Sequence, residues 1–275
     1  MVNILVPTDF SDLSKVAIDY AIKVANKLGG NITLLHVVTV IQPTRASMRL
    51  RLEALEEEMM EMAKEDMKML ITEFAGKIKT EKPLAYEIIQ GSSFNATVKS
   101  VAKKLRSGLV IMGTRGANGL KKVVLGSNTA SVIEISKIPV LVVPEFAEFK
   151  SFKTLVYATD LKHLDDELEL LIPYVKIFES YVHVFHVVSN EKSVEKAEET
   201  IREALTKGGY SKFLIKVVVS KDIDKAVENY VKECKSDLLT TFAHEHSFYE
   251  KLFERSLTKK LAFQSKLPLL AFREN

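Results

Sequence analysis

A glycine-rich stretch in the first half of the chain has the composition of a phosphate-binding loop. It reads Met112-Gly113-Thr114-Arg115-Gly116-Ala117-Asn118-Gly119, and Gly126-Ser127-Asn128-Thr129 follows a little later. The loop begins where an apolar run ends and stops where a helical pattern begins. Glycines let the backbone approach an anion closely, and the unpaired N–H groups and dipole of a helix N-terminus favour negative charge. We therefore expect the N–H groups of Gly126 and Ser127, and the Ser127 hydroxyl, to bind phosphate.

The stretch differs from two common nucleotide-binding loops. It contains no Gly-x-x-x-x-Gly-Lys, and its glycines do not follow the first strand as they do in the dinucleotide fingerprint. From composition alone, a glycine-rich surface turn that binds nothing stays an alternative. Arg115 suits a phosphate, and it also fits an exposed loop arginine.

The elements that position this loop alternate between short β-branched runs and helical patterns. In the first half we expect strands at about 3–7, 31–38, 85–90, 109–112 and 140–143. Helices are expected at about 12–28, 94–105 and 128–137, the first capped by Ser11 and ended by Gly29-Gly30. Most strands are apolar almost throughout, which is typical of parallel strands covered on both faces. The alternation predicts βαβ units with right-handed crossovers.

The second half of the chain repeats the first. The segments 4–9, 34–38 and 138–143 recur in the same order as 155–160, 184–188 and 267–272. Strands are expected near 153–158, 181–188, 213–219, 237–242 and 269–272, and helices near 165–179, 191–207, 222–235 and 249–264. The sequence therefore predicts two tandem α/β domains, 1–147 and 151–275, joined near 145–151.

The spacing Gly113-x2-Gly116-x9-Gly126-Ser127 resembles the ATP-binding signature of the universal stress protein family. The resemblance extends over the first half, in Val6-Pro7-Thr8-Asp9-Phe10-Ser11, Leu34-Leu35-His36-Val37, Gly91 and Pro139-Val140-Leu141-Val142-Val143. It implies two tandem Rossmann-like domains of the adenine nucleotide alpha hydrolase-like type. Each would hold a five-stranded parallel sheet of strand order 3-2-1-4-5. A ligand binds such a sheet at the switch point, outside the carboxyl ends of the first and fourth strands.

The resemblance also assigns residues to the adenosine part of ATP. Pro7, Thr8 and Asp9 would contact adenine and ribose, with Asp9 directed to a sugar hydroxyl or the base edge. Val37 would pack on the adenine.

The phosphate side of the implied site comes from the glycine loop. Met112 and Gly113 would border the ribose and phosphates. The residues expected to hold the triphosphate are Arg115, Gly116, Gly126, Ser127 and Asn128. Mg²⁺ or Mn²⁺ would be held mainly by the phosphates rather than by side chains. No catalytic residue is nominated.

The second half departs from this pattern. Aligned through Pro139 and Pro268, Gly113 becomes Phe242, and Gly116 and Gly126 become Glu245 and Arg255, while Ser127 is kept as Ser256. Pro7 becomes Ala158, although Thr159-Asp160 remains. A phenylalanine would block a triphosphate and a glutamate would repel it. We predict that this half does not bind ATP in the same way, and either binds another ligand or serves as a packing partner.

Composition excludes several classes of protein. The chain is 47% hydrophobic and 27% charged, as in globular proteins. Its net charge of +3 gives no footprint for nucleic acid. No apolar run approaches the roughly 18 residues of a membrane span, and the N-terminus lacks signal-peptide features. We expect a cytoplasmic protein that binds neither nucleic acid nor membrane. The single cysteine, Cys234, excludes an intrachain disulfide and lies at a core spacing.

The histidines give weaker signals. His183 and His186 lie three apart on an expected strand and so face opposite sides. His244 and His246 flank Glu245, but no cysteine or carboxylate cluster supports a metal site there. His36 and His186 share one repeat position, which favours a structural role in the strand over catalysis.

The extra length of the first half lies between Arg45 and Lys79. Apolar residues step there by three and four, at Met48, Leu52, Leu55, Met59 and Met62, with Glu56-Glu57-Glu58 and Glu61 mostly on the other face. One interpretation is a long amphipathic helix with its charged face in water. The other is a protruding helix that packs on a partner.

The favoured function is an ATP-binding stress or signalling protein in which nucleotide occupancy sets conformation or partner choice. The alternative is a slow ATP hydrolase or nucleotidyl-transfer enzyme of the related fold. Against it, the turn after the first strand, Pro7-Thr8-Asp9-Phe10-Ser11-Asp12, lacks the Ser-Gly-Gly-x-Asp-Ser pattern of such enzymes. A structural scaffold that binds no nucleotide is the third hypothesis.

Members of this family commonly form dimers through their last strands. The resemblance therefore also suggests that 140–143 and 269–272 pair within one chain as a pseudo-dimer, with a homodimer as a further step.

Overall fold

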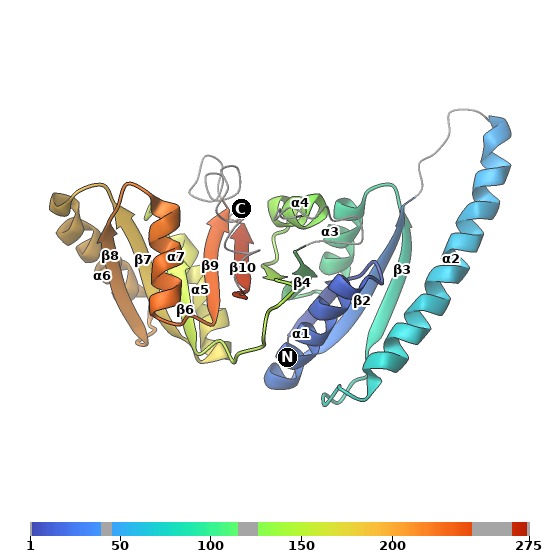
Figure 1. The fold of residues 1–275 in the computed structure, drawn as a ribbon, viewed down its shortest axis with the longest axis horizontal. Coiled ribbons are helices and arrows are strands. Elements are labelled where there is room, and N and C mark those ends of the chain that lie inside the picture. Colours follow the sequence, from blue (N-terminus) through green and yellow to red (C-terminus); the bar gives the residue numbers. More distant parts are fainter. Residues whose placement is uncertain (1, 40–45, 115–125, 244–265, 274–275) are drawn as a thin grey trace. The chain divides into compact units, whose positions relative to one another are not determined.

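The computed structural model describes residues 2–39, 46–114, 126–243 and 266–273, with only the backbone described for 46–52. Contacts within the chain divide the described residues into two compact units, one up to Val140 and the other from Leu141 on (Figure 1). Both units alternate strands and helices, as the sequence predicts. The domain bounds 1–147 and 151–275 stay a prediction.

Counted by the sequence repeat rather than by these two units, the N-terminal half contains five strands and four helices among its described residues. In chain order they are β1 (Asn3–Pro7), α1 (Asp12–Leu28), β2 (Asn31–Thr39), α2 (Ala46–Ala75), β3 (Ala85–Gly91), α3 (Phe94–Lys104), β4 (Leu109–Gly113), α4 (Ser127–Ile135) and β5 (Val140–Val143). The strand order is β3-β2-β1-β4-β5, and β1 pairs in parallel with both β2 and β4. The predicted order 3-2-1-4-5 is confirmed.

Helix α1 shows why the sequence sets its own boundaries. The Ser11 hydroxyl accepts a hydrogen bond from the Ser14 N–H at 3.2 Å and caps the helix. Gly29 ends it at φ 67°, a left-handed conformation that suits glycine. The helix buries its apolar stripe against the sheet at Ala17, Ile18, Tyr20, Ala21, Ile22, Val24 and Ala25.

The C-terminal half repeats this plan. Its described elements are β6 (Thr154–Ala158), α5 (Leu164–Phe178), β7 (Tyr181–Val188), the 3-10 turn η1 (Glu191–Ser193), α6 (Val194–Gly208), β8 (Phe213–Val219), α7 (Ile223–Glu233), β9 (Leu238–Ala243) and β10 (Leu269–Arg273). The strand order β8-β7-β6-β9-β10 is the same as in the first half. The predicted helix at 249–264 lies outside the described residues.

Helix α2 does not pack through the apolar stripe that the sequence analysis identified. The expected stripe at Leu55, Met59 and Met62 is exposed. The side chains that pack into the core come from a second stripe on the same helix, Ala63, Met67, Leu70 and Phe74. The sequence signal located the helix correctly but did not identify the face that packs.

The position of the single cysteine differs from the prediction. Cys234 follows the last residue of α7 and is half-buried rather than in the core. Burial raises the pKa of its thiol, so the unreactive protonated form is favoured there.

Of the helices that the structure describes, none combines the length and apolar character needed to cross a membrane.

Candidate functional site

Most of the predicted site residues that the structure describes in the first half lie at or near one edge of its sheet. Strand β1 ends at Pro7 and β4 ends at Gly113, and the two strands are neighbours with Ile4 opposite Leu109. Parallel neighbours end at the same edge, so the segments that follow Pro7 and Gly113 leave the sheet side by side. This is the switch point of a doubly wound sheet, where ligands bind.

Thr8 is buried and shapes the turn after β1. Its hydroxyl accepts a hydrogen bond from the Phe10 N–H at 3.1 Å and is bonded to the Ser14 hydroxyl at 2.9 Å. Its carbonyl oxygen lies 2.8 Å from His36 Nδ1. Because a carbonyl oxygen only accepts, His36 must donate this bond. The side chain of Thr8 therefore holds the backbone in place and faces the protein interior.

Asp9 is exposed at the tip of the same turn. Its Oδ1 accepts hydrogen bonds from the Ser11 N–H at 3.2 Å and the Ser11 hydroxyl at 2.6 Å. Phe10 follows at φ 63°, a left-handed conformation that costs a bulky residue about 1–3 kcal/mol. The Phe10 ring packs on the His36 ring with a centroid separation of 4.4 Å. These contacts hold the Asp9 carboxylate at the edge of the sheet.

The N-terminus of α4 begins close to the end of β4. Thr129 Oγ1 donates to the Gly113 carbonyl oxygen at 2.9 Å, and the Gly126 N–H donates to the Thr114 carbonyl oxygen at 2.7 Å. Ser127 and Asn128, between these anchors, are exposed. The first turn of the helix is thus fixed beside Gly113.

Among the described residues no side chain caps this helix, because the cap residue is Gly126. In the same half, Ser11 and Ser93 cap α1 and α3 with their hydroxyls. Gly126 has φ −58° and ψ 142°, a conformation that any residue adopts. Its glycine is therefore not explained by backbone geometry. What the glycine does provide is a helix start without a capping side chain, which leaves room for an external anion.

The remaining predicted residues have separate placements. Val37 is half-buried on β2, and Met112 is buried on β4. Gly91, at the end of β3, is explained by packing, since a Cβ there would lie 2.3 Å from Thr97 Oγ1. Arg115 and Gly116 lie outside the described residues, so their assignments stay predictions.

The sheet register tests the alignment of the two halves. In the first half Ile4 pairs with Leu109, and in the second Leu155 pairs with Leu238. Ile4 and Leu155 are repeat equivalents, so Leu109 is equivalent to Leu238. Counting along both strands places Phe242 at the position of Gly113, as the sequence alignment predicts.

Phe242 fills its position in the second half. It is 2% exposed and stacks on Phe272 with a centroid separation of 4.7 Å. It also contacts the Tyr157 ring edge-on at 5.8 Å. The aromatic cluster thus occupies the strand end where, in the first half, Gly113 itself contributes no side chain.

A buried carboxyl group lies beside this cluster, and no sequence pattern predicted it. Glu167 of α5 is 2% exposed and accepts hydrogen bonds from the Tyr157 hydroxyl and, at 2.9 Å, from the Thr159 hydroxyl. Burial and the nearby Glu167 raise the pKa of Tyr157. The turn after β6 keeps the arrangement of the turn after β1 in the first half. His186 Nδ1 lies 2.8 Å from the Thr159 carbonyl oxygen and Leu161 has φ 67°, and His36 and Phe10 are arranged in the same way in the first half.

The other substituted positions of the second half, Glu245, Arg255 and Ser256, lie outside the described residues, as do His244 and His246. Within the described part of the chain, no group of three or more His, Cys, Asp or Glu side chains could hold a metal ion.

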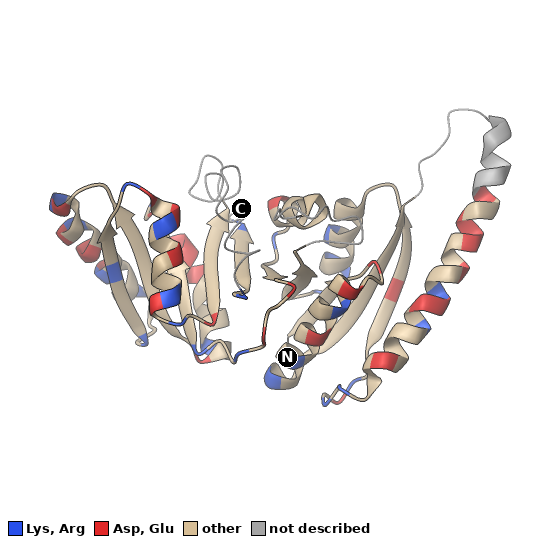
Figure 2. Cartoon of the chain, in the orientation of Figure 1, with Lys and Arg blue, Asp and Glu red and all other residues tan. Residues whose placement is uncertain are grey.

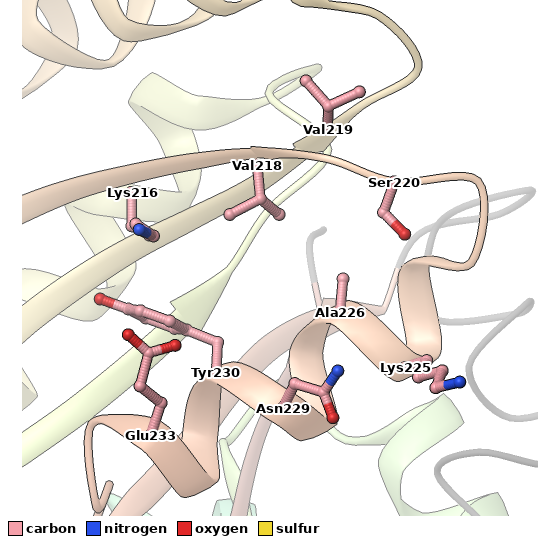
Figure 3. A pocket seen from close by; sticks show the side chains of 9 residues that line it. All are labelled: Lys216, Val218, Val219, Ser220, Lys225, Ala226, Asn229, Tyr230 and Glu233. Carbon is pink, nitrogen blue, oxygen red and sulfur yellow. The ribbon is translucent and has the colours of Figure 1, made fainter.

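The second half also has an open groove of about 300 Å³ between β8 and α7 (Figure 3). Its walls are Lys216, Val218, Val219, Ser220, Lys225, Ala226, Asn229, Tyr230 and Glu233. The Tyr230 hydroxyl is bonded to His183 Nδ1 at 2.8 Å, and its ring stacks on Phe185. Burial raises the pKa of Tyr230 to about 12 and lowers the pKa of His183. Tyr230 therefore lines the groove as a neutral side chain held by packing and a hydrogen bond.

Comparison with known proteins supports the fold and the family. Universal stress protein MJ0531 of Methanocaldococcus jannaschii is 35% identical over 145 residues, which is 51% of this chain and 81% of that protein. Universal stress protein Slr1230 of Synechocystis is 24% identical over 291 residues, covering 99% of this chain and all of that protein. The crystal structure of a universal stress protein from Archaeoglobus fulgidus covers 99% of this chain and 98% of its own, with a TM-score of 0.70 at 18% identity.

The last of these matches shows that the whole chain shares its fold with a solved protein. The family model described as the universal stress protein family matches residues 1–144, the half that carries the glycine loop and the uncapped α4. More than half of the chain is thus matched, and the protein belongs to the universal stress protein family.

Proposed function

We propose that the N-terminal half binds ATP, and that nucleotide occupancy sets the conformation or partner binding of a stress-response or signalling protein. One observation carries the proposal, namely the start of α4, whose cap residue Gly126 has no side chain to cap it and which is anchored beside the end of β4. Unpaired N–H groups at such a helix start favour the charge of a phosphate. The adjacent end of β1 supplies the groups that would recognise the nucleoside.

The nucleoside would lie over the carboxyl ends of β1 and β2. Asp9 is exposed and held by Ser11, so its carboxylate is preorganised to accept a hydrogen bond from a sugar hydroxyl or the base edge. Val37, which is half-buried, would offer apolar surface for the base, and Pro7, which is buried, would contribute mainly by ending β1 beside it. Thr8 would contribute through its backbone, because its hydroxyl is engaged inside the protein.

The triphosphate would extend from Gly113 toward Ser127 and Asn128. The helix start fits an anion, and it offers no carboxylate for a cation. Mg²⁺ or Mn²⁺ would therefore come with the phosphates. We propose no catalytic residue and expect at most slow hydrolysis of ATP.

The C-terminal half would not bind ATP in the same way. Phe242 fills the position of Gly113, and the carboxyl group of Glu167 is buried next to it. Both features disfavour a phosphate at this strand end, one by volume and one by charge. We therefore expect one ATP per chain.

Calorimetric titration with ATP and Mg²⁺ tests the proposal with two variants of Gly126. In Gly126→Asp the new carboxylate can cap α4 and occupy the anion position itself. We expect ATP binding to weaken by at least about 100-fold, or about 2.7 kcal/mol, while thermal stability is kept or rises. Gly126→Ala adds neither a cap nor a charge, and we expect a smaller loss.

Three results would contradict the proposal. The first is equal ATP affinity in the wild type and in Gly126→Asp. The second is no ATP binding by the wild type, which would favour the scaffold hypothesis. The third is binding of ATP at a site that Phe242→Ala, rather than Gly126→Asp, alters.

A further inference from the structure

Helix α2 has two apolar stripes, and only one packs on its own domain. The inner stripe is buried and consists of Ala63, Met67, Leu70 and Phe74. The outer stripe consists of Leu55, Met59, Met62 and Met69, whose side chains are 47%, 38%, 58% and 63% exposed. In Figure 1 α2 lies along β3, and its upper end continues beyond the sheet. The outer stripe is therefore an apolar surface that the fold of this domain does not use.

The outer stripe has the spacing of a helix that packs against another helix. Leu55, Met62 and Met69 follow one another at intervals of seven, and Met59 lies four residues after Leu55, whereas Asp66 stands four residues after Met62, so one acidic side chain interrupts the apolar series. This alternation of four and three residues forms the contact seam of coiled coils. Methionine side chains are flexible and polarisable, so they adapt to the surface they meet.

Acidic residues border the outer stripe on its solvent side. Glu58 and Glu65 are exposed and lie three residues after Leu55 and Met62, on the flank where coiled coils place their interhelical ion pairs. Figure 2 shows acidic residues recurring along α2 with few basic ones between them. Other acidic residues of this helix are already engaged, since Glu73 pairs with Lys15 at 2.8 Å and Glu56 accepts from Gln90 at 2.7 Å.

We propose that the outer stripe of α2 binds an amphipathic helix of a partner protein. The apolar seam of that helix would cover Leu55, Met59, Met62 and Met69, and its flanking Lys or Arg side chains would face Glu58 and Glu65. Charge is what selects the partner. Apolar contact would provide affinity, and the two glutamates would select a cationic helix over an anionic one.

A second copy of the chain fits this surface less well. In an antiparallel pair, Glu58 and Glu65 of both chains come together, and like charges oppose binding. In a parallel pair, the two glutamates face the positions of Ala63 and Leu70, which carry no charge and are buried in their own domain. Neither arrangement gives the glutamates a cation.

Two synthetic helical peptides test the proposal on the full chain. Both have leucine at the seam positions of about four heptads, one with lysine at the flanking positions and the other with glutamate. We expect fluorescence anisotropy to show binding of the lysine peptide, at least about tenfold tighter than that of the glutamate peptide. Leu55→Glu/Met62→Glu should abolish binding, and Glu58→Lys/Glu65→Lys should reverse the preference.

Matched controls come from exposed helical positions in the other half. Leu170→Glu, on α5, introduces the same charge at another exposed leucine. Glu195→Lys/Glu199→Lys, on α6, reverses two exposed glutamates four residues apart. Neither control should change peptide binding.

Several outcomes would overturn the proposal. They are no binding of the lysine peptide, equal binding of both peptides, or equal loss of binding in a control variant. A dimer in sedimentation that Leu55→Glu/Met62→Glu converts to a monomer would assign the stripe to a second copy. A fall in melting temperature of the kind expected for the buried Met67→Glu would assign Leu55 and Met62 to the core. The proposal does not depend on ATP binding, so peptide affinity is measured without nucleotide.

Discussion

His36 donates a hydrogen bond from Nδ1 to the carbonyl oxygen of Thr8, with the two atoms 2.8 Å apart. The bond joins the end of β2 to the turn after β1, and His186 makes the same bond to Thr159 in the second half. The two halves thus share one structural device, although only one of them is proposed to bind ATP. Variants of the two histidines can therefore separate stability from ligand binding.

Replacing His36 by alanine should affect both stability and ATP affinity. The Thr8 carbonyl oxygen loses its donor, which costs about 1–3 kcal/mol in the free energy of unfolding. The turn that holds Asp9 loosens as well, so we expect about tenfold weaker ATP binding. His186→Ala should cost similar stability in denaturant unfolding and leave calorimetric ATP affinity unchanged. Equal loss of ATP affinity in both variants would contradict this account of the turn.

Replacing Asp9 by asparagine should weaken ATP binding without disturbing the turn. Asparagine keeps an oxygen that can accept from Ser11, but it removes the negative charge that strengthens a hydrogen bond to the nucleoside. We expect about tenfold loss of affinity, or about 1.4 kcal/mol, with an unchanged melting temperature. Asp160→Asn is the matched control in the second half. ATP affinity that depends on Asp160 and not on Asp9 would contradict the proposal, because it would place the nucleotide in the C-terminal half.

Replacing Phe242 by alanine should destabilise the chain. The side chain is 2% exposed and packs on Phe272 and Tyr157, and truncation of a buried phenylalanine costs about 3–5 kcal/mol. Phe146→Ala serves as the control, since Phe146 is 66% exposed and its loss should stay within about 0.5 kcal/mol. Denaturant unfolding measures both. Little effect from Phe242→Ala would mean that this strand end is not filled as described.

Stability should decline in alkali because of Tyr157. Burial and then Glu167 raise its pKa in the folded protein above the ordinary value of 10.0. The neutral phenol is thus favoured by folding, so its contribution is complete below pH 10 and is lost as pH rises above it. The slope from one such group is about 1.4 kcal/mol per pH unit.

Tyr157→Phe provides the test of that slope. The variant should be less stable at pH 7, because Glu167 loses a buried donor, yet its unfolding free energy should fall less steeply above pH 10. Unfolding by urea at pH 7, 9, 10 and 11 measures both effects. Parallel pH profiles of the variant and the wild type would exclude Tyr157 as the source of the alkaline loss.

Local sequence signals are enough to predict the elements and their order. Ser11 and Gly29 bound α1, the repeated segments establish two equivalent halves, and the glycine spacing locates the loop before α4. These signals are local, because a cap, a turn or an apolar period acts within a few residues along the chain. The parallel order of the strands follows from the same alternation, since short connections and right-handed crossovers leave few topologies.

The faces and contact partners of those elements depend instead on how the elements pack together. Either stripe of α2 has helical spacing, and only the position of the sheet decided that Met67 is buried while Met62 is exposed. Glu167 reads as a surface helix residue until the fold brings it to Tyr157 and Thr159. Thr8 is likewise predicted to contact the ligand, but in the structure its hydroxyl is hydrogen-bonded to the Ser14 hydroxyl. Contacts between residues on different elements depend on packing across the whole domain, and no local period encodes them.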